Sequence, residues 1–138
     1  MAFENVNYLA ILVAGIISMV VGFLWYGPLF GKAWMRLSGF DSKKIDESKK
    51  KGMTKSYIIM FIATLIFACV LATLLGMMSI TTFTRGMWIG FLVWLGFYAT
   101  SGLGMLLWEG KPFKLYVINM LHYLVVLLII GGMLAVWR

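Results

Sequence analysis

Long apolar stretches alternate with shorter polar ones along the chain. Four stretches, at residues 6–27, 57–80, 87–108 and 115–137, are almost entirely hydrophobic, and none carries Lys, Arg, Asp or Glu in its interior. The hydrocarbon core of a bilayer is about 30 Å thick and needs roughly 20 apolar residues in a helix. The pattern therefore predicts four transmembrane helices.

The composition supports this prediction and excludes other classes. Of the 138 residues, 62% are hydrophobic and 12% are charged, whereas soluble domains have about 45–50% apolar and about 25% charged residues. A small soluble domain could not hide so much apolar surface, and disordered chains are poor in such residues. The helices are apolar on all faces, unlike those of a soluble bundle. We therefore predict an all-α, four-helix membrane bundle as one domain over residues 1–138.

Positive charge is concentrated on one side of the predicted bundle. The net charge is +7, and eight of the twelve cations lie in the loop at residues 28–56. Because Lys and Arg favour cytoplasmic loops, we expect a multi-pass protein of the cell membrane with this loop in the cytoplasm and both termini outside. The basic loop favours anionic lipid headgroups as partners, and no nucleic-acid-binding motif is present.

The basic loop divides into two parts. In the first part, Phe30, Trp34 and Leu37 share one helical face, whereas the cations take the opposite face; we expect a short interfacial helix that begins near Pro28 and stops at Gly39. The second part, at residues 41–52, has oppositely charged pairs four residues apart and predicts a short solvated helix. The residues expected to contact headgroups or the interface are Lys32, Trp34, Arg36, Lys49, Lys50 and Lys51.

The ends of the first and third stretches are similar. The first reads G-F-L-W-Y-G-P-L-F-G-K-A-W, and the third reads G-M-L-L-W-E-G-K-P-F-K-L-Y. The order and spacing favour duplication of a helical hairpin in parallel topology, with the symmetry axis along the membrane normal. The alternative is that any helix end at the cytoplasmic interface selects aromatic residues, Gly, Pro and Lys.

The segment LWYGPLFGKAWM, at residues 24–35, closely resembles the N-terminal motif of a membrane family known as domain of unknown function 1761. The segment W-E-G-K-P-F-K-L-Y-V-I-N and the apolar helix after it are similar to the rest of that family. The resemblance spans nearly the whole chain and implies a small polytopic membrane protein. It implies no activity and no functional residues.

Each predicted helix carries small residues at a spacing of four, which places them on one face. Such faces allow helices to approach closely in a bilayer, where the hydrophobic effect does not hold helices together. They could pack within one bundle or form a contact of a homo-oligomer. The expected packing residues are Ala14, Ser18, Gly22, Ala68, Ala72, Gly76, Gly96, Thr100 and Gly104.

Polar side chains at membrane depth are the candidate functional residues. Tyr26, Glu109, Asn119 and His122 could converge near the cytoplasmic face as a polar vestibule, in which His122 would act as a titratable gate or proton carrier. Alternatively, Asn119 and His122 form hydrogen bonds with other helices, and Glu109 pairs with a nearby lysine. The expected helix partners are Ser18, Thr64 and Thr100, and the expected lysines are Lys111 and Lys114. We favour this second interpretation.

The sequence provides few residues for catalysis. It has one histidine and one cysteine, Cys69, which excludes an intrachain disulfide. We find no metal-binding spacing, no glycine-rich phosphate loop and no catalytic set, and we expect no metal or cofactor. The leading hypothesis is passage of an ion or small solute by a small homo-oligomeric channel or transporter. The alternative is a membrane scaffold or lipid- or partner-binding module that uses the basic loop, and an enzyme ranks last.

Overall fold

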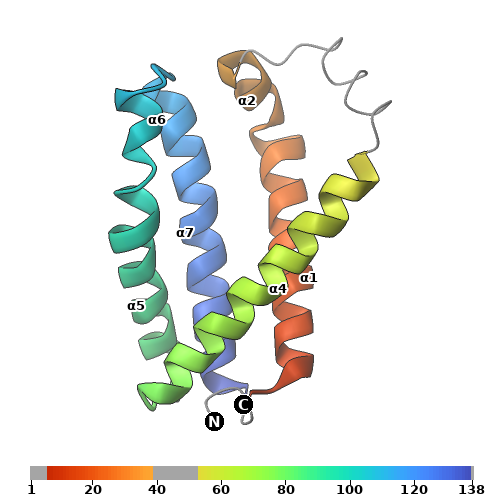
Figure 1. Ribbon diagram of the computed structural model, residues 1–138, viewed down its shortest axis with the longest axis vertical. Coiled ribbons are helices and arrows are strands. Elements are labelled where there is room, and N and C mark those ends of the chain that lie inside the picture. The colour runs from red at the N-terminus through yellow and green to blue at the C-terminus, as the bar shows by residue number, and fades with distance from the viewer. Residues whose placement is uncertain (1–5, 39–52, 138) are drawn as a thin grey trace.

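The computed structural model describes residues 6–38 and 53–137, and all of its regular elements are helices (Figure 1). In chain order they are α1 (Tyr8–Leu24), the π-helix η1 (Trp25–Leu29), α2 (Gly31–Ser38), α4 (Met53–Met77), α5 (Phe83–Val93), the π-helix η2 (Trp94–Ala99), α6 (Leu103–Leu107) and α7 (Phe113–Val136).

The prediction of four helices long and apolar enough to span a membrane is confirmed. The candidate spans are Tyr8–Leu29, Met53–Met77, Phe83–Leu107 and Phe113–Val136. Helices satisfy their own backbone hydrogen bonds, which is why apolar chain in lipid takes this form. The predicted solvated helix at residues 41–52, including Lys49, Lys50 and Lys51, lies outside the described residues.

The first span ends differently from the prediction. Pro28 lies inside η1 rather than at the start of the following helix, and α2 begins at Gly31. The backbone N–H of Phe30 donates to the carbonyl of Trp25, 2.8 Å away, in a five-residue step that passes over Pro28. Because proline has no N–H to donate, this wider turn tolerates it within the span.

The third span is not the single regular helix that the apolar pattern predicts. It changes to the π-helix η2 at Trp94 and contains a turn before α6 begins at Leu103. The Thr100 hydroxyl donates to the carbonyl of Gly96 at 2.7 Å, and bonds of this kind bend helices. Hydropathy does not register such an interruption, since every residue in it remains uncharged.

The helices form an uneven bundle. In Figure 1, α1, α5 and α7 run along the long axis, whereas α4 crosses them diagonally. The start of α1 and the end of α7 lie at one end of the bundle, with the connection from α4 to α5; α2 and α6 lie at the other. We call the first the closed end and the second the open end.

Close helix packing is concentrated at the closed end. A Cβ atom added to Gly86 of α5 would collide with the carbonyl oxygen of Gly131 of α7 and lie 2.6 Å from the Cβ of Ala135. One turn along, a Cβ on Gly90 would collide with the carbonyl oxygen of Leu127. These glycines let the two backbones touch, which is the usual basis of helix association in lipid. We call this contact the glycine seam.

The buried core lies next to the glycine seam and joins α1 and α4 to α7. The core side chains come mainly from the first half of α1, the second half of α4 and the second half of α7. Those with no exposed surface are Ala10, Ala14, Ala68, Leu75 and Ile130. The first half of α4, by contrast, is largely uncovered by protein.

The predicted packing residues divide into two groups. Ala14, Ser18, Ala68 and Ala72 are buried between helices, and Gly22 of α1 faces α7. The others are less covered by protein: Gly76, Gly96 and Thr100 are exposed, and a Cβ added to Gly104 would meet only Trp108 of its own chain segment within 4 Å. Their use in a homo-oligomer stays a prediction, as does the duplication of the hairpin.

Candidate functional site

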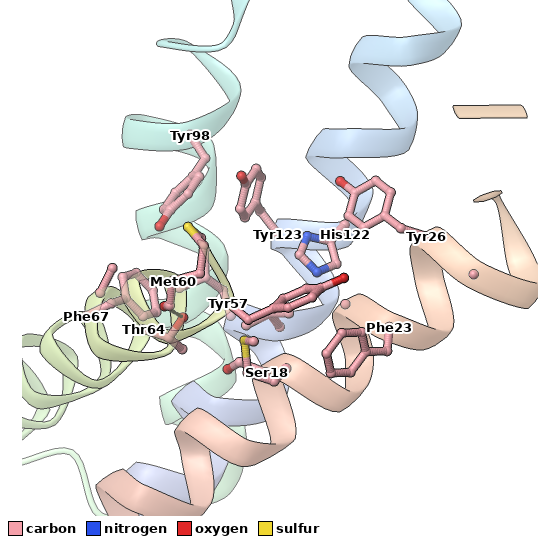
Figure 2. A pocket seen from close by; sticks show the side chains of 16 residues that line it. Ser18, Phe23, Tyr26, Tyr57, Met60, Thr64, Phe67, Tyr98, His122 and Tyr123 are labelled. Carbon is pink, nitrogen blue, oxygen red and sulfur yellow. Dashed lines mark hydrogen bonds between the residues drawn. The ribbon is translucent and has the colours of Figure 1, made fainter. Parts of the chain in front are cut away.

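A cavity of about 620 Å³ lies between α1 and η1, the first half of α4, η2 and α7 (Figure 2). It is not enclosed, because its lining side chains on α4 include Tyr57 and Met60, which are 43% and 55% exposed. It ends against Val126 and Leu127, which belong to the core. The cavity is therefore open on its side and blocked toward the closed end.

The cavity wall is aromatic and uncharged. In the part of the chain that the structure describes, no Asp, Glu, Lys or Arg lines the cavity, although several lining residues carry hydroxyl or imidazole groups. The wall is formed by Ser18, Met19, Gly22, Phe23, Tyr26, Gly27, Tyr57, Met60, Ala63, Thr64, Phe67, Tyr98, His122, Tyr123, Val126 and Leu127. Such a wall suits an uncharged molecule, because a charge taken out of water needs a charged partner.

His122 of α7 lies among three aromatic rings. Its ring centroid is 5.1 Å from that of Tyr26, 5.1 Å from that of Tyr123 and 6.2 Å from that of Trp25. Both imidazole nitrogens are covered by protein atoms, and neither has a hydrogen-bond partner in the described part of the chain. Figure 2 shows the imidazole between Tyr26 and Tyr123.

Two tryptophans connect the spans to α7. The indole N–H of Trp25 in η1 donates to the carbonyl of Ile118 at 2.9 Å, and that of Trp94 in η2 donates to the carbonyl of Met120 at 2.7 Å. Each tryptophan is the first residue of a π-helical segment. The segment η1, which continues α1, and the segment η2, which continues α5, are thus each hydrogen-bonded to α7 beside the cavity.

Tyr26 and Asn119 form a polar contact next to His122. The Tyr26 hydroxyl donates to Oδ1 of Asn119 at 2.8 Å, and the Asn119 amide lies 3.9 Å from the sulfur of Met105. The bond fixes the Tyr26 ring beside His122. The bond also commits the Tyr26 hydroxyl proton to Asn119, so that it is not donated to an imidazole nitrogen.

Several tyrosines of the cavity lie outside the predicted vestibule. These are Tyr57, Tyr98 and Tyr123, which line the cavity and whose hydroxyl groups have no hydrogen-bond partner among the described residues. The rings of Tyr98 and Tyr123 are 4.8 Å apart, and Tyr98 also contacts Phe67 at 6.1 Å. The signal in the sequence was weak, because tyrosine near a span end is also typical of the membrane interface.

The structure brings three of the four predicted vestibule residues together. Tyr26, Asn119 and His122 are neighbours, whereas Glu109 is exposed between α6 and α7 and does not line the cavity. Glu109 makes no ion pair with Lys111 or any other described residue.

The expected hydrogen bonds of Asn119 and His122 with Ser18, Thr64 or Thr100 are not formed; Asn119 bonds instead to the hydroxyl of Tyr26. Ser18, Thr64 and Thr100 each donate to a carbonyl four residues earlier in their own chain segment, at 2.7–2.8 Å. Each of these hydroxyls thus has a hydrogen-bond acceptor within its own chain segment and needs none from another helix.

The α2 helix lies at the open end and packs beside the cavity residue Tyr26. Trp34 packs against Tyr26 with ring centroids 5.9 Å apart, whereas Lys32 and Arg36 are exposed. The other described cations of the open end are Lys55, Lys111 and Lys114, and Arg85 lies at the closed end. Lipid contact by this helix stays a prediction.

The described residues provide no metal site. Within residues 6–38 and 53–137, no group of three His, Cys, Asp or Glu side chains is close enough to hold a metal ion. His122 and Glu109 are also not brought together as an acid–base pair would require.

Comparison with known proteins gives a family. No curated protein and no solved structure matches the chain. The profile of a family described as "Protein of unknown function (DUF1761)" matches residues 9–135, which include all four candidate spans apart from their outermost residues. The resemblance found in the sequence is confirmed, and the chain belongs to the DUF1761 family.

Proposed function

We propose that this protein binds a small, uncharged and largely apolar molecule in the cavity. The cavity itself carries the proposal, because its volume of about 620 Å³ falls within the range of about 300–1,000 Å³ typical of sites for small molecules. Its open side along the first half of α4 gives access from the surrounding lipid. Because the cavity ends against the core, it can hold a molecule but does not lead through the bundle.

The aromatic wall supports an uncharged ligand. Rings such as those of Phe23, Tyr98 and Tyr123 offer faces and edges against which an aromatic or aliphatic body can pack. None of the described cations lines the cavity. An inorganic ion would lose its hydration in this cavity without gaining a charged partner.

The proposal predicts that an apolar probe will occupy the cavity specifically. We would incorporate 3-fluorotyrosine at Tyr98 in full-length protein in lipid nanodiscs and titrate 2-methylnaphthalene. The fluorine resonance at Tyr98 should shift and saturate, whereas the same label at Tyr8, which does not line the cavity, should change only as the bilayer takes up probe. The measurement is fluorine NMR.

Two variants make this test specific. Ala63→Phe adds a ring to the cavity wall and should abolish the saturable shift. Val70→Phe adds a ring on the outer surface of α4, at a residue that is 46% exposed, and should preserve it. Equal shifts at Tyr8 and Tyr98, or saturation that survives Ala63→Phe, would reject the proposal.

Passage of an ion or small solute through a homo-oligomer is a second candidate. It is supported by the third span, which the other helices cover least and which exposes Gly96 and Thr100 to a possible neighbour. Such passage predicts a discrete oligomer in the detergent-corrected particle mass and proton or ion flux in proteoliposomes. A monomer of 15.6 kDa without flux would reject it.

The basic open end supports a third, narrower role in lipid binding. Lys32 and Arg36 are exposed on α2 and can each add about 1 kcal/mol of attraction to an anionic bilayer. A scaffold or partner-binding role would use the same surface. An enzyme has the least support, because Glu109 lies apart from the cavity that His122 lines.

A further inference from the structure

His122 has hydrogen-bonding atoms that nothing in the described chain satisfies. Both nitrogens are buried and have no partner within residues 6–38 and 53–137. A neutral imidazole has one nitrogen that donates and one that accepts. Buried polar groups are nearly always paired, so an exception calls for an explanation such as a ligand.

Three donors around His122 already have partners, and the hydroxyl of the neighbouring Tyr123 bonds to neither imidazole nitrogen. The Tyr26 hydroxyl is bonded to Asn119, and the Trp25 indole N–H is bonded to the carbonyl of Ile118. The Ser18 hydroxyl is bonded within α1. None of these donors can turn to the imidazole without losing a bond, and a partner therefore has to come from outside this set.

The cavity is the route by which such a partner can reach the imidazole. His122 lines the cavity. Because both of its nitrogens are covered, only carbon atoms of its side chain face the cavity. The second side-chain torsion of histidine is broad. The residue facing Nε2 from α1 is Gly22, whose added Cβ would lie 3.6 Å away. A turn of the ring can thus bring a nitrogen to the cavity.

We infer that His122 is the hydrogen-bonding contact for the ligand of this cavity, and that the ligand is an uncharged molecule with an apolar or aromatic body and one hydroxyl, carbonyl or amide group. This inference rests on the proposed function. The body packs against the aromatic wall, and the polar group pairs with the imidazole. The ligand thereby satisfies an atom that the empty protein leaves unpaired.

The single histidine of the chain makes a direct test possible. Protein labelled with ring-¹⁵N histidine, in nanodiscs, gives signals from His122 alone. We would compare 2-naphthol with 2-methylnaphthalene, which share the naphthalene body but differ in the hydroxyl group. Without probe, the unprotonated nitrogen should show the ¹⁵N shift of a free lone pair. Saturating 2-naphthol should move it toward the hydrogen-bonded value, and 2-methylnaphthalene should not.

Affinity gives a second readout. After correction for partition into lipid, 2-naphthol should bind about five- to tenfold tighter than 2-methylnaphthalene, as one net hydrogen bond allows. The half-saturation of the fluorine shift at Tyr98 measures both affinities. His122→Phe keeps a ring and should bring the ratio near one. Tyr123→Phe removes a hydroxyl from the same wall and tests the competing hydrogen-bonding group. Tyr8→Phe removes a hydroxyl outside the cavity and is the control that should leave the ratio unchanged.

The outcomes separate this inference from the proposed function. If both probes shift the fluorine but 2-naphthol leaves the nitrogen unchanged, the role of His122 is rejected and the binding function stands. A nitrogen that is already hydrogen-bonded without probe, or a ratio lost only in Tyr123→Phe, also rejects it. If neither probe gives a saturable fluorine shift, both proposals fail.

Discussion

The closed and open ends of the bundle share the same four spans but use different residues at their contacts. At the closed end, glycine and alanine bring backbones together, as where Gly86 meets Gly131. At the open end, α4 diverges from the other helices and large rings such as Tyr26 and Tyr98 stand at the contacts. Small residues thus close a helix contact in lipid, whereas aromatic residues hold helices apart and leave a space between them.

The largest effect on this comparison is expected from opening the closed end. Gly86→Ala should lower the free energy of unfolding by about 2 kcal/mol, because the new methyl group collides with a backbone carbonyl and with Ala135, 2.6 Å away. Unfolding in mixed micelles measures this loss. The matched control is Gly96→Ala, where an added Cβ meets nothing within 4 Å.

Gly96→Ala should be neutral or stabilise the protein by up to about 1 kcal/mol, since alanine favours helix. Equal losses at Gly86 and Gly96 would mean that the glycine seam is not what closes the bundle.

A smaller effect is expected from loosening the open end. Trp25→Phe and Trp94→Phe each remove an indole N–H that donates to α7, and each should cost about 1 kcal/mol. Hydrogen exchange should become faster in the first half of α7 than in its second half. Trp88→Phe, at a 57% exposed position, is the control and should change neither measurement.

The smallest effect is expected at His122 in the empty protein. His122→Phe should leave stability unchanged or raise it by up to about 0.5 kcal/mol, because it removes nitrogens that have no partner among the described residues. Tyr26→Phe, which breaks the 2.8 Å bond to Asn119, should instead lower stability by about 0.6 kcal/mol. A larger loss of stability in His122→Phe than in Tyr26→Phe would show that the imidazole already stabilises the protein without a ligand.

Much of the candidate site was visible in the sequence, but its partners were not. Polar residues in apolar stretches are few, so Asn119 and His122 stood out at once. The expectation that they would bond to Thr64 or Thr100 failed because those hydroxyls bond to their own helices. Glu109 was grouped with them because it lies at a similar predicted depth in the membrane. Depth alone does not say whether a residue of a loop faces the interior of the bundle.

The cavity itself could not be predicted. Its existence depends on the diagonal crossing of α4, which places Tyr57 and Met60 at an open margin instead of a packed face. After Ser56, α4 is apolar along both of its halves, so its hydropathy gives no sign of where it leaves the other helices. Its crossing angle therefore comes from contacts such as those of Ala68 and Leu75 in the core. The sequence of one helix does not say which residues of the other helices these side chains will meet.

The sequence by itself determined the class of protein and its helices, because an apolar chain in lipid must satisfy its backbone hydrogen bonds internally and each stretch can do so alone. Only the tertiary structure decided which small residues meet, where the third span bends and which side chains surround the cavity. All four helices are apolar on every face, so hydropathy cannot choose among their possible contacts. That choice depends on close approach, as at the glycine seam, and on a few polar bonds such as that from Trp25 to α7.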